Sequence, residues 1–312
     1  MSSENSPHLS SQTREKLYRL RKKNNLTVRI KSYSDKDKDP KRQLMWGDYW
    51  VKHELADELG NLGLLIVEKE PDVLIHLFGS PTEGLSKDTY NIVWFYSHPD
   101  RVNSENLKEY DRIYCASSDF IPKLRKMGYE NAELMFACTS KQPPDVPIEY
   151  DIVFVGNART RRADGRSVIS DMGKTEFNFK VWGNLWENIL PNKYYGGRYW
   201  AYQELQRLYA SSLITLNDHH HDMAREGFVS NKIFDILAGG GFAISQNNSG
   251  IEGIFEDSVP QYESAEQLRD LVKFYLRNPK ERERLMLKGR RIALDHTYQK
   301  RAIQMTRDFL SD

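Results

Sequence analysis

Residues 226–245 read EGFVSNKIFDILAGGGFAIS, a short helical pattern that ends at three glycines and leads into a strand pattern. Ser230 and Asn231 are good helix-capping residues, and Lys232 adds a positive charge in the first turn. The N-terminus of a helix carries unpaired N–H groups and a partial positive charge, so a cation there is unfavourable unless an anion lies in front of it. The stretch therefore predicts an anion-binding helix whose apolar face, from Ile233 onward, is buried.

Asp235 lies one turn beyond Lys232, at the spacing that makes helix side chains neighbours. Its carboxylate could accept hydrogen bonds from a diol such as a ribose. The alternative is an ion pair between Lys232 and Asp235 on a solvated face, which contributes only about 0.2–0.5 kcal/mol. The position of the helix between two strand patterns favours the binding role.

Outside this stretch, apolar runs rich in β-branched and aromatic residues alternate with helical patterns, which is typical of α/β units with parallel strands. The proline-rich segment SKQPPDVPIE, residues 140–149, predicts a stiff linker. We expect two doubly wound, Rossmann-like domains facing across a cleft, with ligands at the carboxyl ends of the strands. The predicted parts are a polar and basic tail (1–25), a first domain (26–140), a linker (141–150), a second domain (151–290) and a C-terminal helix (291–312).

The composition limits the classes of function. The chain has 45 Lys and Arg against 44 Asp and Glu, a net charge of +1, which disfavours a nucleic-acid acceptor. Cys115 and Cys138 lack metal-ligand or CxxC spacing, and no apolar run approaches the roughly 20 residues of a membrane span. We expect a cytoplasmic protein. The basic stretch TREKLYRLRKKNN is a solvated tail or a weak contact with a membrane surface.

The string SNKIFDILAGGGFAIS resembles the SNK-(L/I)-F-(E/D)-x-(L/M)-A-x-G-x-x-(V/I)-I-S element in the donor-binding domain of GT-B glycosyltransferases of the group 1, family-4-like class. Five further stretches resemble the branch that includes the spore-coat maturation glycosyltransferases: LNDHHHDMAREGF, HTYQKRA, WGDYWVKHELADELGNLG, WFYSHPDRV and YDRIYCASS. The resemblance spans about residues 45–310. It implies a GT-B fold, a nucleotide-diphosphate sugar held by the second domain, an acceptor on the first, and a C-terminal helix that packs back on the first domain.

Carried over by position, the resemblance places Lys232 against the diphosphate and Asp235 on the ribose hydroxyls, with Ser230 and Asn231 at the phosphates. The spacing departs from the two-glutamate pattern of the family, because Glu226 and Asp235 lie nine residues apart rather than eight. The other donor-binding candidates lie at predicted strand ends or just before the helix: Gly156, Asn157, Arg159, Gly183, Asn217, Asp218, His219 and Phe228.

The loop FVGNARTRR combines a glycine, an amide and three arginines, so a diphosphate could lie against its backbone; the alternative is a basic surface loop. It lacks the GxGxxG spacing of a dinucleotide site. The segment DHHHD, residues 218–222, predicts no metal site, because consecutive side chains on an irregular segment do not converge on one ion. We expect no metal and no cofactor beyond the donor substrate.

Two residues of the first domain are candidates for catalysis. Asp48 follows the first predicted strand and His98 follows the fourth, so either could serve as the base that an inverting transfer needs. A retaining transfer of the family-4 kind needs no such base, and His98 could instead be structural. His296 and Arg301, in HTYQKRA, are expected to be structural.

The sequence thus predicts a metal-independent glycosyltransferase that moves a sugar from a nucleotide-diphosphate donor to a carbohydrate, protein or small-molecule acceptor. Two alternatives stay open: a nucleotide-sugar epimerase on the same fold, and a non-catalytic partner subunit that binds a nucleotide or a carbohydrate. The donor base and sugar, the acceptor, the stereochemical course and the oligomeric state are left open at this point.

Overall fold

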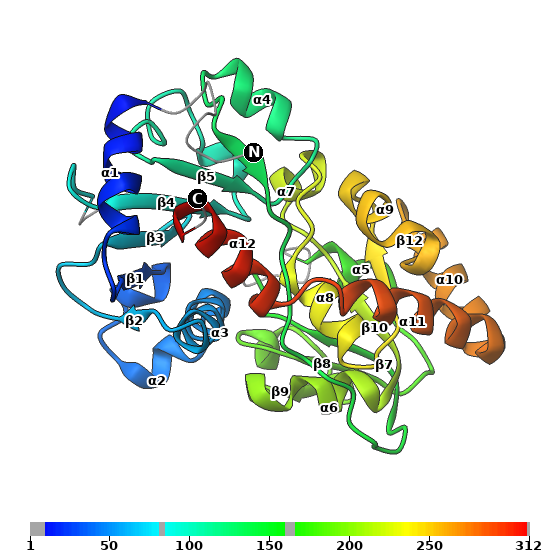
Figure 1. Ribbon diagram of the computed structural model, residues 1–312. Helices are drawn as coiled ribbons and strands as arrows, with labels where there is room; N and C mark the ends of the chain where they lie inside the picture. The colour runs from blue at the N-terminus through cyan, green and yellow to red at the C-terminus, as the bar shows by residue number, and fades with distance from the viewer. Residues whose placement is uncertain (1–9, 81–84, 160–165, 311–312) are drawn as a thin grey trace. The chain divides into compact units, whose positions relative to one another are not determined.

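The computed structural model describes residues 10–80, 85–159 and 166–310, and the chain divides into two compact units. The first unit comprises residues 1–137, 226–228 and 297–312, and the second comprises 138–225 and 229–296. Each unit is built on a six-stranded parallel sheet with helices packed against it (Figure 1). The predicted α/β class with two parallel sheets is confirmed.

The first sheet has the strand order β2-β1-β3-β4-β5-β6. The runs VLIHL and YNIVWF form its central strands, in which every residue is buried, as expected where helices cover both faces of a parallel sheet. The strands at the two edges are only two and three residues long. The strands are β1 (Thr27–Lys31), β2 (Leu65–Ile66), β3 (Val73–Leu77), β4 (Tyr90–Phe95), β5 (Arg112–Cys115) and β6 (Ala132–Leu134).

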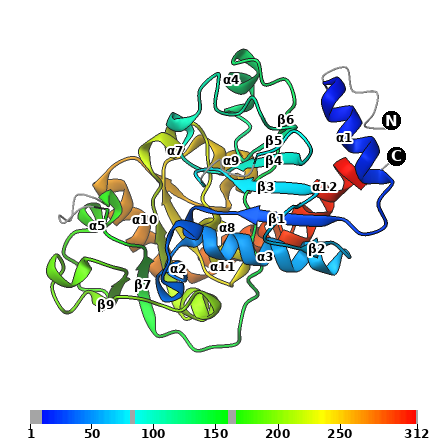
Figure 2. The same cartoon turned by 90° about the vertical axis from the view of Figure 1, so that its left-hand side faces the viewer.

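The longest helix of the first unit, α3, buries Val51, Leu55 and Leu59, which recur every four residues along one face. The C-terminal helix α12 contacts both α1 and α3, and Figure 2 shows it beside α1. The helices here are α1 (Ser11–Arg21), α2 (Pro40–Gln43), α3 (Gly47–Asn61), α4 (Ile121–Lys126) and α12 (Tyr298–Leu310), with short 3₁₀ turns η2 (Tyr33–Lys36) and η3 (Pro99–Arg101).

Buried polar contacts hold α12 in place. Arg301 donates from Nε to the carbonyl oxygen of Phe136 at 2.7 Å and from Nη2 to that of Ala137 at 3.2 Å. One turn from the C-terminal end of the helix, Asp308 accepts a hydrogen bond from the hydroxyl of Tyr114. The predicted structural role of Arg301 is therefore confirmed.

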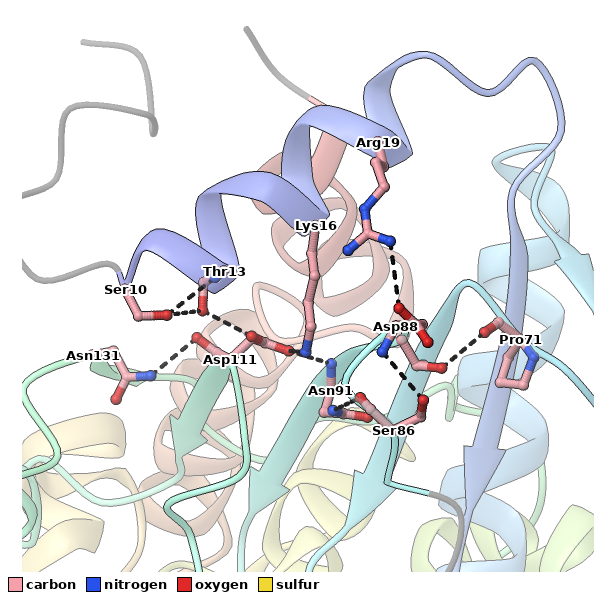
Figure 3. Close-up of polar contacts among 11 residues, drawn as sticks. Ser10, Thr13, Lys16, Arg19, Pro71, Ser86, Asp88, Asn91, Asp111 and Asn131 are labelled. Atoms are coloured by element: carbon pink, nitrogen blue, oxygen red, sulfur yellow. Dashed lines mark hydrogen bonds and ion pairs between the residues drawn. The ribbon is translucent and has the colours of Figure 1, made fainter.

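The basic N-terminal stretch forms α1, which lies across the amino ends of β4 and β5 (Figure 3). Leu17 and Leu20 are buried, and Lys16 and Thr13 both bond to Asp111. The apolar face that a membrane-surface helix would insert is thus used inside the unit, and the interpretation of this part as a solvated tail is wrong. Residues 1–9 of the predicted tail lie outside the described residues.

Within the described ranges, none of the helices has both the length and the apolar composition of a membrane span.

The second sheet has the order β12-β11-β10-β7-β8-β9 and a core on each face. One face packs against α5, α10 and α11 through a large cluster that includes Phe154, Leu216 and Ile244. On the other face, Val153 and Trp182 pack against Leu208 of α6. The strands are β7 (Tyr150–Val155), β8 (Phe179–Trp182), β9 (Tyr195–Gly197), β10 (Ser212–Asn217), β11 (Ala243–Gln246) and β12 (Gln261–Tyr262).

The predicted helix after Ser230 is α8, which is buried from Ile233 to Ala238 and ends at the glycines that lead into β11. The helices of this unit are α5 (Ser167–Met172), α6 (Leu205–Ala210), α7 (His221–Arg225), α8 (Asn231–Ala238), α9 (Ser249–Phe255), α10 (Ala265–Arg277) and α11 (Pro279–Ala293). Three 3₁₀ turns accompany them: η5 (Trp186–Asn188), η6 (Tyr202–Glu204) and η7 (Glu256–Ser258).

Candidate functional site

The carboxyl ends of β7, β8 and β10 are neighbours in the second sheet, so the residues that follow these strands meet at one edge. We call it the carboxyl edge of the second sheet. It gathers most of the predicted donor-binding residues: Gly156, Asn157 and Arg159 after β7, Gly183 after β8, and Asn217, Asp218 and His219 at the end of β10.

The loops after β7 and β8 touch each other through their backbones. Gly183 has φ +146°, and a Cβ there would lie 2.3 Å from the carbonyl oxygen of Gly156, so only glycine fits. The side-chain oxygen of Asn157 accepts a hydrogen bond from the backbone of Asn184 at 2.9 Å, and Trp186 Nε1 donates to the carbonyl of Gly156 at 2.6 Å. Gly183 and Asn157 therefore shape this edge, whether or not they also contact a ligand.

Asp218 lies at the centre of the charges at this edge, with its side chain completely buried. It pairs with Arg166, and Arg159 Nη2 lies 3.6 Å from its Oδ1. Both arginines are held further by backbone carbonyls: Arg166 Nε donates to Asn157 at 3.0 Å, and Arg159 Nη1 donates to His219 at 3.0 Å. Asp218 thus fixes two guanidinium groups side by side.

Of the two arginines that pair with Asp218, Arg166 was not predicted from the sequence. It lies ten residues beyond Gly156 and just before α5, outside the FVGNARTRR loop that drew attention. Its guanidinium lies 5.4 Å from the ring centre of Phe154. The only signal in the sequence was one more arginine in a basic stretch. The two predicted arginines 161 and 162 lie outside the described residues.

Lys232 completes a basic cluster, which we define as Arg159, Arg166 and Lys232 around Asp218. Its Nζ lies 4.8 Å above the ring of Phe154, the same ring that Arg166 approaches. The pKa of Lys232 is lowered to about 7, chiefly by burial and also by the neighbouring arginines, while Asp218 opposes them. Asp235 is buried, so the alternative of an ion pair with Lys232 on a solvated helix face is wrong.

The N-terminus of α8 has no side-chain cap. Ser230 is its N-cap but makes no side-chain capping bond, and its Oγ is buried with no partner among the described residues. The Ser230 N–H donates to His219 Nε2 at 3.2 Å, while burial lowers the pKa of His219 to about 3 and keeps the ring neutral. The first turn contains no acidic residue. The first N–H groups of the helix and the basic cluster therefore point to an anion from outside the chain.

Asp235 and Asn231 make contacts within the second unit. Asp235 is buried, and its Oδ1 accepts a hydrogen bond from Thr139 Oγ1 at 2.6 Å. Asn231 Nδ2 donates to the carbonyl of Cys138 at 3.3 Å. One oxygen of Asp235 is therefore committed to structure, and its predicted bond to a ribose stays a prediction.

One predicted donor contact is wrong. Phe228 is fully buried in the first unit, where its ring packs 4.9 Å from that of Phe95 and 5.5 Å from that of Phe120. It is a core residue rather than a ligand contact, because no face of the ring is exposed. The carboxylate of its neighbour Glu226 pairs with Lys123 in the same unit.

The two catalytic candidates lie in the first unit. Asp48 sits in the first turn of α3 and accepts a hydrogen bond from the backbone of Ser34 at 2.8 Å. Burial raises the pKa of Asp48 above its usual value, as a general base would need. His98 follows β4 with φ +56°, a left-handed conformation that is uncommon for a residue other than glycine. Their roles stay predictions.

No group of three or more His, Cys, Asp or Glu side chains is placed to hold a metal ion in the part of the chain that the structure describes. In the DHHHD segment, Asp218 and His219 are buried at the end of β10, whereas His221 and Asp222 begin α7.

Comparison with known proteins agrees with this architecture. Residues 161–307 match the family described as glycosyl transferase-like. No match was found among curated proteins. A structure of the T4 phage β-glucosyltransferase, in complex with UDP and Mn²⁺, superposes with a TM-score of 0.61 at 10% identity, covering 92% of this chain and 100% of that one.

Two further solved structures are similar. The sucrose-phosphate synthase of Thermosynechococcus elongatus has a TM-score of 0.62 at 11% identity and covers 91% of this chain and 98% of its own. An α-glucosyltransferase in complex with UDP and a 13-mer DNA has a TM-score of 0.62 at 10% identity, covering 92% and 100%. The two parallel sheets thus form the GT-B fold that these glycosyltransferase structures have. Residues 161–307 are the glycosyl transferase-like part of the chain; the spore-coat branch is not established.

Proposed function

We propose that the chain transfers a sugar from a nucleotide-diphosphate donor, and that the donor's diphosphate binds the basic cluster and the N-terminus of α8. The observation that carries this proposal is the excess of cations at the carboxyl edge of the second sheet. Arg159, Arg166 and Lys232 surround Asp218, the carboxylate that pairs with both arginines among the described residues. A diphosphate brings the negative charge that this arrangement lacks.

The basic cluster and the N–H groups of α8 would also stabilise the diphosphate as it leaves the sugar. Transfer of the sugar leaves negative charge on the departing diphosphate, and preorganised cations and N–H groups stabilise it without moving. Arginine forks bind phosphate oxygens in pairs, and Lys232 acts as a compact point charge. We propose that these residues take the place of a metal ion, so that transfer continues in excess EDTA and gains little from Mn²⁺ or Mg²⁺.

The proposal also assigns roles to residues at the end of β10, in α8 and in the first unit. Asn217, Asp218 and His219 would line the sugar side of the diphosphate, and Asp235 would lie at the ribose. Asp48 and His98 remain the candidates for a base in the first unit. The acceptor would be a carbohydrate, a protein or a small molecule.

Thermal shift with UDP, GDP, ADP, CDP and TDP, followed by release of the nucleoside diphosphate from the matching nucleotide sugars, tests the proposal. UDP is the first probe because the similar structures hold it. A ligand at 100 times its Kd stabilises by about 2.7 kcal/mol. We expect one nucleotide to stabilise the wild type and to lose its effect in Arg166→Met and Lys232→Met.

Failure of all five nucleotides to stabilise the protein would contradict the proposal. Isomerised donor in the absence of any acceptor would favour the epimerase alternative instead. Nucleotide binding without release of sugar from any donor would favour a non-catalytic subunit. The carboxylate of Glu226, which pairs with Lys123 and departs from the family spacing, is the observation that keeps this last alternative worth testing.

A further inference from the structure

The segment between β1 and α3 carries three large apolar side chains on the surface of the first unit. Tyr33, Met45 and Trp46 are 37%, 36% and 41% exposed, and the rings of Tyr33 and Trp46 lie 5.2 Å apart at an angle of 58°. We call these three residues the aromatic platform. Contiguous exposed apolar groups on a folded protein commonly mark a binding surface.

The segment that carries the platform is held by several hydrogen bonds. Gln43 Nε2 donates to the carbonyl of Asp37 at 2.7 Å, and Trp50 Nε1 donates to that of Leu44 at 3.0 Å. The backbone of Ser34 is held by Asp48 at 2.8 Å. Side-chain hydrogen bonds from the segment and from α3 therefore fix the backbone that presents the exposed rings.

The charges around the platform cancel. Residues 33–50 contain four basic side chains, Lys36, Lys38, Lys41 and Arg42, and four acidic ones, Asp35, Asp37, Asp39 and Asp48. Arg42 pairs with Asp37 at 3.2 Å, and Asp35 pairs with Lys52 at 2.9 Å. A surface that binds a polyanion or an anionic membrane needs a surplus of free cations, which this segment does not have.

We propose that the aromatic platform binds a sugar ring of a neutral glycan acceptor. A sugar ring has an apolar C–H face that packs against an aromatic ring, and a rim of hydroxyl groups that bond to polar side chains such as those of Lys36 and Asp37. The platform follows the carboxyl end of β1, the edge at which parallel sheets bind their ligands. This inference rests on the proposed function, since it names the acceptor class.

Calorimetric titration of the full chain with neutral hexasaccharides tests the inference. The probes are malto-, cello-, chito- and mannohexaose, with a heparin hexasaccharide and a ten-nucleotide thymidine strand as anionic comparisons. We expect one neutral series to bind, with affinity at least tenfold lower in Trp46→Ala and Tyr33→Ala and within threefold of wild type in Trp46→Phe. Binding of the same sugar should change little between 50 and 300 mM salt.

Tyr18 offers a matched control in the same unit. It is 55% exposed, and Lys22 lies over its ring at 4.0 Å just as Lys36 lies over that of Tyr33 at 4.3 Å. Tyr18→Ala should bind the hexasaccharide as the wild type does. Equal losses in Tyr18→Ala and Tyr33→Ala would overturn the inference, because they would indicate a general effect of exposed aromatic residues.

Three other results would overturn it: tighter, salt-sensitive binding of either anionic probe, wild-type affinity in Trp46→Ala, or no binding of any neutral probe. Titration of the same samples with UDP tests the proposed function separately, because the predicted UDP site lies in the second unit. Glycan binding that depends on Trp46 without UDP binding would support this inference and contradict the proposed function. The reverse pattern would contradict this inference alone.

Discussion

Asp111 and Asp218 are both buried aspartates held by cations, yet their surroundings differ. At the amino end of β5, Asp111 accepts from Thr13 Oγ1 at 2.8 Å, from Lys16 Nζ at 2.7 Å and from the backbone of Asn91 at 2.9 Å (Figure 3). The Asp111 carboxylate pairs with one cation, Lys16, and both of its oxygens accept hydrogen bonds. The cluster is closed, and its effect is to attach α1 to the first sheet.

Asp218 belongs to an open cluster. It shares one oxygen between Arg166 and Arg159, while its Oδ2 is buried with no partner in the described part of the chain. Asn217 Oδ1, His219 Nδ1 and Ser230 Oγ are buried without partners there as well. Buried polar groups are normally bonded, so several unbonded groups beside excess positive charge indicate that a ligand is expected. The closed cluster holds α1 on the first sheet, and the open cluster is the one that we propose binds the diphosphate.

The largest effect should follow from removing Asp111. Asp111→Ala leaves the buried ammonium of Lys16 without its partner, which typically costs about 3–5 kcal/mol of folding free energy. Urea unfolding measures the loss. The control is Asp88→Ala, whose exposed pair with Arg19 spans 3.5 Å and should cost less than about 1 kcal/mol. Similar small losses in both variants would mean that the first cluster holds nothing together.

Gly183→Ala should have the next largest effect. It tests the open cluster, because it displaces the backbone of the loops after β7 and β8 that carry part of it. The added Cβ would collide with the carbonyl of Gly156, and φ +146° is strained for alanine, so we expect a loss of about 3 kcal/mol. Gly253→Ala in α9 is the control, because its Cβ meets no atom within 4 Å and should stabilise by about 0.5 kcal/mol. Thermal melts compare the two, and equal melting temperatures would refute the close approach.

Removing one cation from the open cluster should weaken binding rather than folding. Arg166→Met loses charged hydrogen bonds to the diphosphate, so the affinity for UDP, or for whichever nucleotide the screen identifies, should fall by about 30-fold, roughly 2 kcal/mol. Arg166→Met leaves Asp218 paired with Arg159 alone. Arg166→Lys keeps the positive charge without the guanidinium fork, so it tests whether the charge alone is enough for nucleotide binding. Calorimetry measures both variants. Unchanged affinity in Arg166→Met would contradict an anion site here.

The smallest effect concerns pH. Burial lowers the pKa of Lys232, but part of its side chain is exposed, so solvent reduces the stability difference that follows from the shift. Folding lowers its pKa from the usual 10.5 to about 7, so the unfolded chain binds more protons between these values. The stability of the wild type relative to Lys232→Met should therefore rise with pH across that window. Urea midpoints from pH 6.5 to 9.5 measure the difference. A flat difference would mean that Lys232 keeps an ordinary pKa.

Much of the fold was predictable because strands buried on both faces leave near-continuous apolar runs. VLIHL and YNIVWF have no polar alternation, and both became central strands. The strands β9 and β12 were not predicted, because segments of three and two residues are too short to show a hydrophobic periodicity. The helix after Ser230 was predicted through its capping residues and the glycines that end it.

The site was predicted in part, and the errors have one cause. The sequence pattern placed Ser230 at the start of α8 and Lys232 in its first turn, and their contacts with a donor stay predictions. Phe228 and Asp235 depend on partners about 100 residues away, such as Thr139, which lies 96 positions from Asp235. Their roles are set by packing that no local pattern records. Arg166 was missed for the same reason, since its partner Asp218 lies 52 positions away.

The most direct test of the central claim is the pKa of Lys232, measured from the ¹³Cε chemical shift with and without UDP and assigned with Lys232→Met. We expect a pKa of about 7 in the free protein. Bound diphosphate should raise it by roughly 1–3 units, because an opposite charge within a few ångströms favours the protonated form. Uridine, which lacks phosphate, should not change it. The same pKa with and without saturating UDP would contradict a diphosphate at the N-terminus of α8.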